Sequence, residues 1–139
     1  MDHPRLAVGV DLLMARADLE HREQAAFFDW LELQYPRLYE HAYAVPNGGH
    51  RHRAVAGKLK AEGVKAGVLD ICIDMPGNSH HGTRIEMKVA PNRPTPEQTA
   101  WIKRLSAAGY EVRVCYGFDE ARQAILDIYG IPEHWRRWR

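Results

Sequence analysis

The sequence predicts an α/β fold in which a small mixed β-sheet is flanked by helices. Apolar residues alternate along 68–75 and again along 83–89, and the Pro-Gly-Asn turn of residues 76–78 lies between the two runs, a pattern typical of an antiparallel hairpin. A helical pattern over 96–108 and a strand over 111–116 follow. Because a strand, helix and strand in this order form a right-handed crossover, the last two strands are expected to be parallel and the sheet mixed.

The remaining elements are weaker signals. Asp18 is expected to cap a helix that ends before Pro36, with apolar side chains at helical spacing. Gly63 is expected to stop a short basic helix. The expected elements outside the hairpin and crossover are helices over 5–17, 19–34, 53–62 and 119–129, and a strand over 41–45.

Length and composition indicate one domain that needs no disulfide bonds. The chain has 139 residues, 45% of them hydrophobic, and a formal net charge of +1, which is typical of a globular domain. The two cysteines, Cys72 and Cys115, lie in apolar runs without metal-finger spacing and are expected to be reduced core residues. We expect a single domain over 1–139, with a helical extension (1–18), a core (19–129) and a basic, aromatic tail (130–139).

The sequence also indicates where in the cell the protein acts. No apolar run reaches the roughly 18 residues that a transmembrane helix needs, and the N-terminus lacks a secretory signal pattern. We therefore expect a cytoplasmic protein without a membrane partner.

Charge is distributed unevenly along the chain. Residues 1–40 hold eight acids and four arginines, whereas residues 44–69 hold five basic side chains and one acid, and the last six residues add three arginines. Such a distribution suits a protein that holds a polyanion on one face. A solvated loop and helix would give the same pattern.

The pattern that carries chemistry is Glu86-Met87-Lys88. Residues two apart in a strand face the same way, so the Glu86 carboxylate and the Lys88 ammonium are expected to project together. Asp70 lies in an apolar run on the neighbouring strand, where a carboxylate is costly unless it is paired or binds a cation. Asp70 and Glu86 are thus candidate ligands of one hard divalent cation, and Lys88 is a candidate to orient attacking water. The alternative is a surface ion pair, since short E-x-K triplets are common.

Four spaced blocks give this pattern a family context. Residues 44–49, 63–70 and 94–101, followed by Ala108-Gly109-Tyr110, resemble the VRR-NUC family of the PD-(D/E)xK nuclease superfamily. The resemblance covers about residues 19–126, although Leu69 stands where the superfamily name has proline. It implies a restriction-endonuclease-like core and an Mg²⁺- or Mn²⁺-dependent nuclease.

The resemblance also implies site residues. Asp70 and Glu86 would bind the metal, together with the backbone carbonyl of Met87, and Lys88 would be the catalytic lysine. The family's helical acid matches Glu20, although helical spacing alone leaves Glu23 open.

Gln98 matches a family glutamine near the metal. It also stands three residues after Thr95, where a capping box would use it, and both roles are compatible.

The basic middle segment supplies candidate DNA contacts. Backbone amides and the side chain of Asn47-Gly48-Gly49 are candidates to approach a phosphate, although Asn-Gly is also typical of a tight hairpin turn. Basic side chains that follow would hold phosphates without reading sequence. These candidates are Arg51, Arg53, Lys58 and Lys60.

The primary hypothesis is a metal-dependent DNA endonuclease that acts as a homodimer on branched DNA such as Holliday junctions, as in DNA repair, and that is encoded by a bacterium or phage. No small-molecule cofactor is expected. One alternative is a non-catalytic module that binds DNA structures. Another is a restriction-type or effector nuclease that cuts linear duplex.

Overall fold

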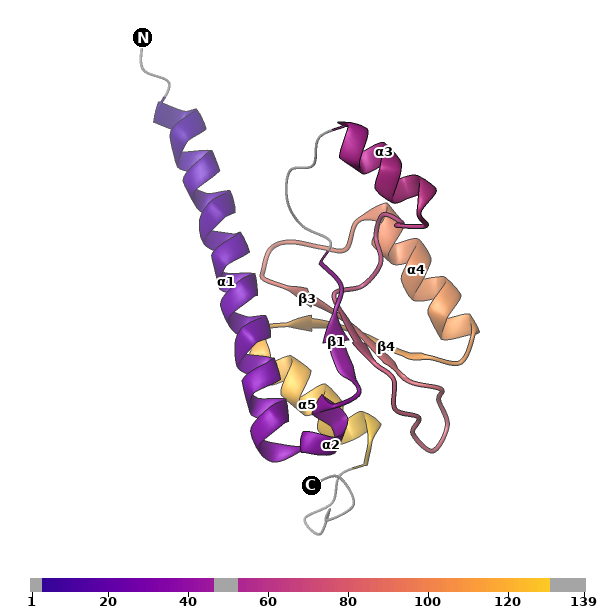
Figure 1. Cartoon of the computed structure of the whole chain (residues 1–139). Helices are drawn as coiled ribbons and strands as arrows, with labels where there is room; N and C mark the ends of the chain where they lie inside the picture. The colour runs from indigo at the N-terminus through magenta and orange to yellow at the C-terminus, as the bar shows by residue number, and fades with distance from the viewer. Residues whose placement is uncertain (1–3, 47–52, 131–139) are drawn as a thin grey trace.

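The computed structural model describes residues 4–46 and 53–130, with side chains from residue 12 onwards. These parts of the chain form five helices and four strands, whose arrangement is shown in Figure 1. In chain order they are α1 (Pro4–Gln34), α2 (Pro36–Tyr39), β1 (Ala42–Ala44), α3 (Arg53–Ala61), β2 (Ile71–Ile73), β3 (Thr83–Lys88), α4 (Pro96–Ala107), β4 (Glu111–Tyr116) and α5 (Phe118–Ile128).

The four strands form one mixed sheet in the order β1-β2-β3-β4. β1 and β3 both pair antiparallel with β2, and β3 pairs parallel with β4 through the crossover helix α4. This confirms the predicted hairpin, crossover and fold class. Four strands and one long crossover keep the consecutive elements adjacent in space, as expected for a small domain.

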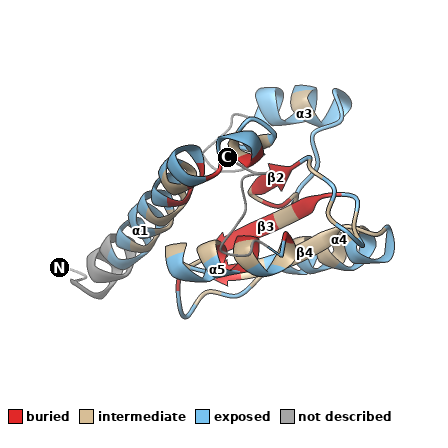
Figure 2. Ribbon diagram, turned by 90° about the horizontal axis from the view of Figure 1, so that it is seen from below, coloured by how far each residue is buried: buried red, intermediate tan, exposed pale blue. Residues whose placement is uncertain are grey.

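The main core lies between the sheet and helices α1, α2 and α5. Phe27 and Leu31 of α1 and Ile125 of α5 are fully buried against Ile71 and Ile85 of the sheet. Figure 2 shows β2 and β3 as the most buried part of the chain. The alternate side chains of β3 point to the other face, which α4 covers, so the strand that carries the E-x-K pattern is buried on both faces.

One expected boundary is wrong. α1 is a single helix of 31 residues rather than two helices separated at Asp18. Asp18 lies inside it, with its carboxylate 3.0 Å from the Arg22 guanidinium one turn later, and does not cap a helix. Residues 10–34 contain no glycine or proline, and an internal aspartate costs a helix only a few tenths of a kcal/mol. Helix α1 can therefore continue through Asp18 without further stabilisation at this position.

The other elements differ from expectation at their ends. β2 is shorter than the predicted 68–75, although the Val45 amide still donates to the Asp70 carbonyl (2.8 Å) and the Asp74 amide to the His41 carbonyl (2.9 Å). The predicted strand over 111–116 is reproduced, and the other predicted elements agree within two residues at each end. Within the described residues, the helices are too short or too polar to cross a bilayer.

Candidate active site

Asp70 and Glu86 face each other across β2 and β3. Ile71 pairs with Ile85, which brings the preceding residue, Asp70, beside Glu86. The Asp70 amide donates to Glu86 Oε2 (3.2 Å), and the Met87 amide donates to Asp70 Oδ2 (3.0 Å). Each carboxylate is thus fixed by the backbone of the opposite strand, and the two acid groups are held next to each other.

Glu86 is the most deeply buried acid in the described part of the chain, with 2% of its surface exposed. Gln98 Nε2 donates to its Oε1 (2.8 Å), and Lys88 Nζ lies 3.3 Å from the same oxygen. The Lys88 side chain is itself largely buried. This is not the solvated surface pair that a chance E-x-K triplet would give.

The electrostatics of this cluster disfavour the state in which both carboxyl groups are ionised and no cation is bound. Burial and, after it, the negative charge of Asp70 together raise the pKa of Glu86 to about 7, against the opposing effect of Lys88. Burial also raises the pKa of Asp70. Two acids crowded in a low-dielectric site resist ionising together, and a cation bound between them would remove that cost.

The donor set fits a hard divalent ion that keeps water in its shell. Asp70 and Glu86 supply oxygen ligands, which Mg²⁺ and Mn²⁺ prefer. Among the residues that the structure describes, no group of three or more His, Cys, Asp or Glu side chains lies close enough together to bind a metal ion. Two protein carboxylates with water and substrate phosphate around the rest match Mg²⁺ better than Zn²⁺, which takes three or four protein ligands.

Tertiary contacts separate the two helical acids that spacing left open. Glu23 Oε2 accepts the Phe118 amide at 2.7 Å and so caps the start of α5, where Gly117 has no side chain to do it. Glu20 lies within electrostatic reach of the site: burial raises its pKa, Lys88 lowers it and Asp70 raises it. Glu20 is therefore the acid of α1 that faces the cluster, and its role as a ligand stays a prediction.

Gln98 forms the capping box considered for it and also contacts Glu86, while its role at a metal centre stays a prediction. Its Oε1 accepts the Thr95 amide (2.8 Å) while Thr95 Oγ1 accepts the Gln98 amide (3.2 Å), which is a complete capping box. The other end of the same side chain donates to Glu86. The cap thus fixes the amide that holds the buried carboxylate.

Two contacts that the sequence did not reveal fix the segment before Asp70. Trp101 Nε1 donates to the Ala66 carbonyl (3.1 Å). Gly67 has φ +79, and a Cβ there would lie 2.6 Å from the Glu97 backbone. Only glycine allows this approach, so the segment leading to Asp70 rests directly on the first turn of α4.

The candidate DNA contacts are only partly described. Asn47, Gly48, Gly49 and Arg51 lie outside the described residues, so their role stays a prediction. Arg53, Lys58 and Lys60 lie on α3, which has no buried residue.

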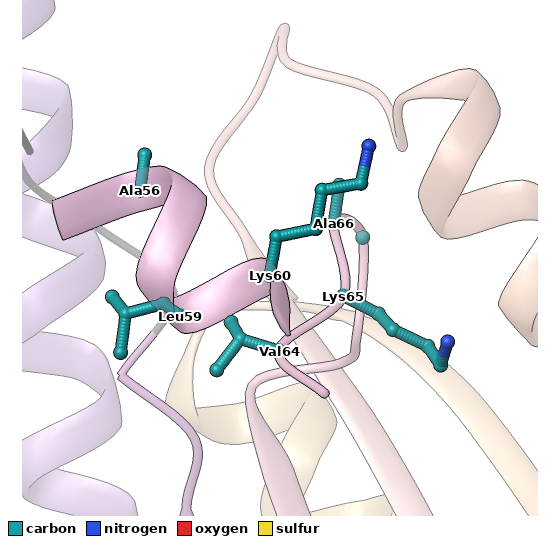
Figure 3. Close-up of a pocket in the computed structure, with 7 residues that line it drawn as sticks. Ala56, Leu59, Lys60, Val64, Lys65 and Ala66 are labelled. Carbon is teal, nitrogen blue, oxygen red and sulfur yellow. The ribbon is translucent and has the colours of Figure 1, made fainter. Parts of the chain in front are cut away.

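A cavity of about 660 Å³ lies between α3 and the segment that follows it. Its lining includes Lys60 and Lys65 together with aliphatic residues (Figure 3). Lys65 was not among the predicted contacts, although it belongs to the same basic run.

Comparisons with known proteins agree with this fold. A family model described as the VRR-NUC domain matches residues 11–119. A solved structure described as a VRR_NUC domain protein is 29% identical, with a TM-score of 0.71 over 81% of this chain and 88% of that chain. No curated protein matches the chain. With the family model matching most of its length and a PD-(D/E)xK-like sheet shared with a solved relative, this chain belongs to the VRR-NUC domain family of nucleases.

Proposed function

We propose that this protein is an Mg²⁺- or Mn²⁺-dependent DNA endonuclease that selects branched DNA, Holliday junctions in particular. The observation that carries the proposal is the opposed pair Asp70 and Glu86, with Lys88 and Gln98 on the same buried carboxylate. A carboxylate pair that is costly without a cation, beside a buried ammonium, is the arrangement that hydrolysis of a phosphodiester needs.

Each residue has a defined part in the proposed reaction. Asp70 and Glu86 would hold the cation, with Glu20 and the Met87 carbonyl as further candidate ligands. When bound, the cation supplies positive charge against the charge that develops on the phosphate oxygens. Gln98 fixes the orientation of Glu86.

Lys88 would orient the attacking water and stabilise the same developing charge. Oxygen from water adds to phosphorus and the bond to the 3′ oxygen breaks, which leaves a 5′-phosphate and a 3′-hydroxyl.

Selection of branched DNA follows from the small size of the domain and from pairing of two copies. One site cuts one strand, so resolution of a junction needs two symmetric sites, as a homodimer provides. Leu12, Leu13 and Met14 are more than half exposed in the N-terminal half of α1, which extends beyond the sheet (Figure 1). These apolar side chains offer a surface for a second copy. We also propose that the protein acts in the cytoplasm of a bacterial or phage-infected cell.

The test is cleavage of a labelled panel of four-way junction, 5′ flap, splayed arm, linear duplex and single strand, with Mg²⁺, Mn²⁺ or EDTA. We expect paired cuts in the junction that need metal. Glu86→Ala and Lys88→Met should reduce the rate by at least about 10²-fold. Glu32→Ala and Lys103→Met, at exposed helix positions, are the matched controls and should cleave normally.

The other outcomes discriminate between the alternatives. Full activity in Glu86→Ala or Lys88→Met would refute the site assignment. Binding of junctions without cleavage in any metal would indicate a binding module, and cutting of linear duplex at one sequence would indicate a restriction-type nuclease. Light scattering on the purified protein tests the dimer.

A further inference from the structure

A second cavity, of about 500 Å³, opens directly beside the carboxylate pair. One wall is a face of α1 that includes His21, Ala25 and Phe28, and the opposite wall is the end of β1 through Val45. Asp70 lines the cavity at one side. The volume is within the range of pockets that bind small organic groups, about 300–1,000 Å³.

The two walls are placed by regular structure rather than by a loose loop. Residues 21, 24, 25 and 28 share one face of a helix because they are three or four apart. The Val45 amide donates to the Asp70 carbonyl at 2.8 Å, so the end of β1 and Asp70 belong to the same ladder. Phe28 is half-buried and makes edge contacts with Phe27 and Tyr39, which hold its ring in place.

The chemistry of this cavity differs from that of the cavity in Figure 3. Lys60 and Lys65 line the cavity in Figure 3. The described lining of the cavity beside Asp70 has neither lysine nor arginine. It contributes aliphatic groups, one aromatic ring, the Gln24 amide and the His21 imidazole. Among these described lining residues a phosphate would meet neither a lysine nor an arginine and would face Asp70. The cavity is suited to the uncharged part of a nucleotide.

We propose that this cavity binds the sugar and base of the nucleotide next to the scissile phosphate, with the base packed on Phe28. The inference rests on the proposed function. If a phosphodiester is held at Asp70 and Glu86, the nucleoside next to it lies beside the cavity, because Asp70 also lines the cavity. A ring-shaped base and an aromatic side chain form a contact that tolerates any sequence, and Gln24 and His21 offer hydrogen bonds at the wall.

This assignment supplies a reason for selecting branched DNA. A base inside the cavity has left its stack, which costs a few kcal/mol in an intact duplex and much less where a base is already unpaired. A nucleotide at a branch point or a flap therefore enters more readily than one in linear duplex. Selection would then come from base stacking and pairing that open more easily at the branch point, as well as from two copies of the site.

The test combines substrates that lack one base with a variant that fills the cavity. A tetrahydrofuran abasic residue replaces each nucleotide around the branch point of the junction in turn, and any cut is mapped separately on the intact substrate. Binding is measured with Ca²⁺ and single-turnover cleavage with Mg²⁺. Since stacking on an aromatic side chain contributes about 1–3 kcal/mol per base, we expect one abasic position beside the cut to weaken binding about 5- to 150-fold.

Ala25→Leu should fill the cavity without touching the core, because Ala25 is exposed on α1. We expect Ala25→Leu to bind the intact substrate as weakly as wild type binds the abasic one, and to lose the position dependence. Ala26→Leu, at the adjacent exposed position, is the matched control and should behave as wild type.

The results separate this inference from the proposed function. A flat binding profile across the abasic series, or an Ala25→Leu variant that discriminates as wild type does, overturns the inference even where cleavage is robust. A position-dependent binding profile without cleavage in Mg²⁺ or Mn²⁺ supports the inference and removes the proposed activity. Failure to bind any DNA overturns both.

Discussion

We expect Glu86 to make the metal-free protein less stable at neutral pH than a neutral side chain at this position would, because of the raised pKa of its carboxyl group. The pKa of this carboxyl is raised from 4.5 to about 7 by burial and by the charge of Asp70. The folded state therefore binds this proton more tightly than the unfolded state. Below pH 4.5 both states are protonated, and as the pH rises through 4.5 to about 7 the folded state loses stability relative to the unfolded state.

The size of the effect follows from the shift. One pKa unit corresponds to about 1.4 kcal/mol, so a shift from 4.5 to about 7 amounts to roughly 3 kcal/mol once both states are ionised. Glu86→Gln removes the titrating proton and keeps the shape. Its amide leaves one of the donors around Glu86 without an acceptor, which costs about 1 kcal/mol, but that cost is the same at every pH.

The measurement is urea unfolding of wild type and Glu86→Gln in EDTA at pH 5 and pH 8. We expect the stability of Glu86→Gln relative to wild type to rise by about 2–3 kcal/mol between these two pH values. Mg²⁺ at pH 8 should then stabilise wild type and narrow the difference, because a ligand stabilises only the state that binds it. Glu32→Gln, on the exposed side of α1, is the control and should show no such pH dependence. A stability difference between Glu86→Gln and wild type that is the same at pH 5 and pH 8 would refute the reasoning.

Three further predictions follow from the contacts around the site. Glu20→Gln should reduce metal-dependent cleavage without lowering thermal stability. Glu23→Gln should instead lose about 1 kcal/mol of stability and keep cleavage in the folded protein, because it weakens the cap of α5. Calorimetry and measurement of the cleavage rate test both variants. Thr95→Ala should cost about 1 kcal/mol, because the Gln98 backbone amide loses its acceptor, and should leave the cleavage rate nearly unchanged, because the Thr95 backbone amide still holds the Gln98 side chain that donates to Glu86; a much slower reaction by the folded variant would contradict this. Gly67→Ala should destabilise the protein by about 1–3 kcal/mol in urea unfolding, because it combines a left-handed φ with a 2.6 Å approach to α4.

The parts of the fold that the sequence predicts best are those with a strong local period. The alternating runs around Asp70 and Glu86 indicated the central hairpin because period-two patterning fixes both strand identity and the facing side chains. The break expected at Asp18 failed for the opposite reason. A cap residue is only a local preference, and here an ion pair to Arg22 and an uninterrupted run of helix-forming residues outweigh it.

The same distinction applies to the site. The opposition of Asp70 and Glu86 could be expected from strand pairing alone. Choosing between Glu20 and Glu23 could not, because both positions lie near the apolar stripe of α1, and what separates them is a hydrogen bond from Glu23 to Phe118, far along the chain. The contact from Trp101 to Ala66 is equally non-local, and no sequence period signals it.

The N-terminal turns of α4 connect these observations. Gln98 holds Glu86 from this helix, and Trp101 together with the close approach at Gly67 holds the segment that leads into Asp70. Both carboxylates are therefore positioned against one helix as well as against each other. α3 buries none of its own residues and is joined to Asp70 through this same segment. Phosphates held by the lysines of α3 would thus be placed relative to the carboxylate pair by the packing of Gly67 and Ala66 on α4, and these two residues would then be part of the geometry of the proposed cleavage.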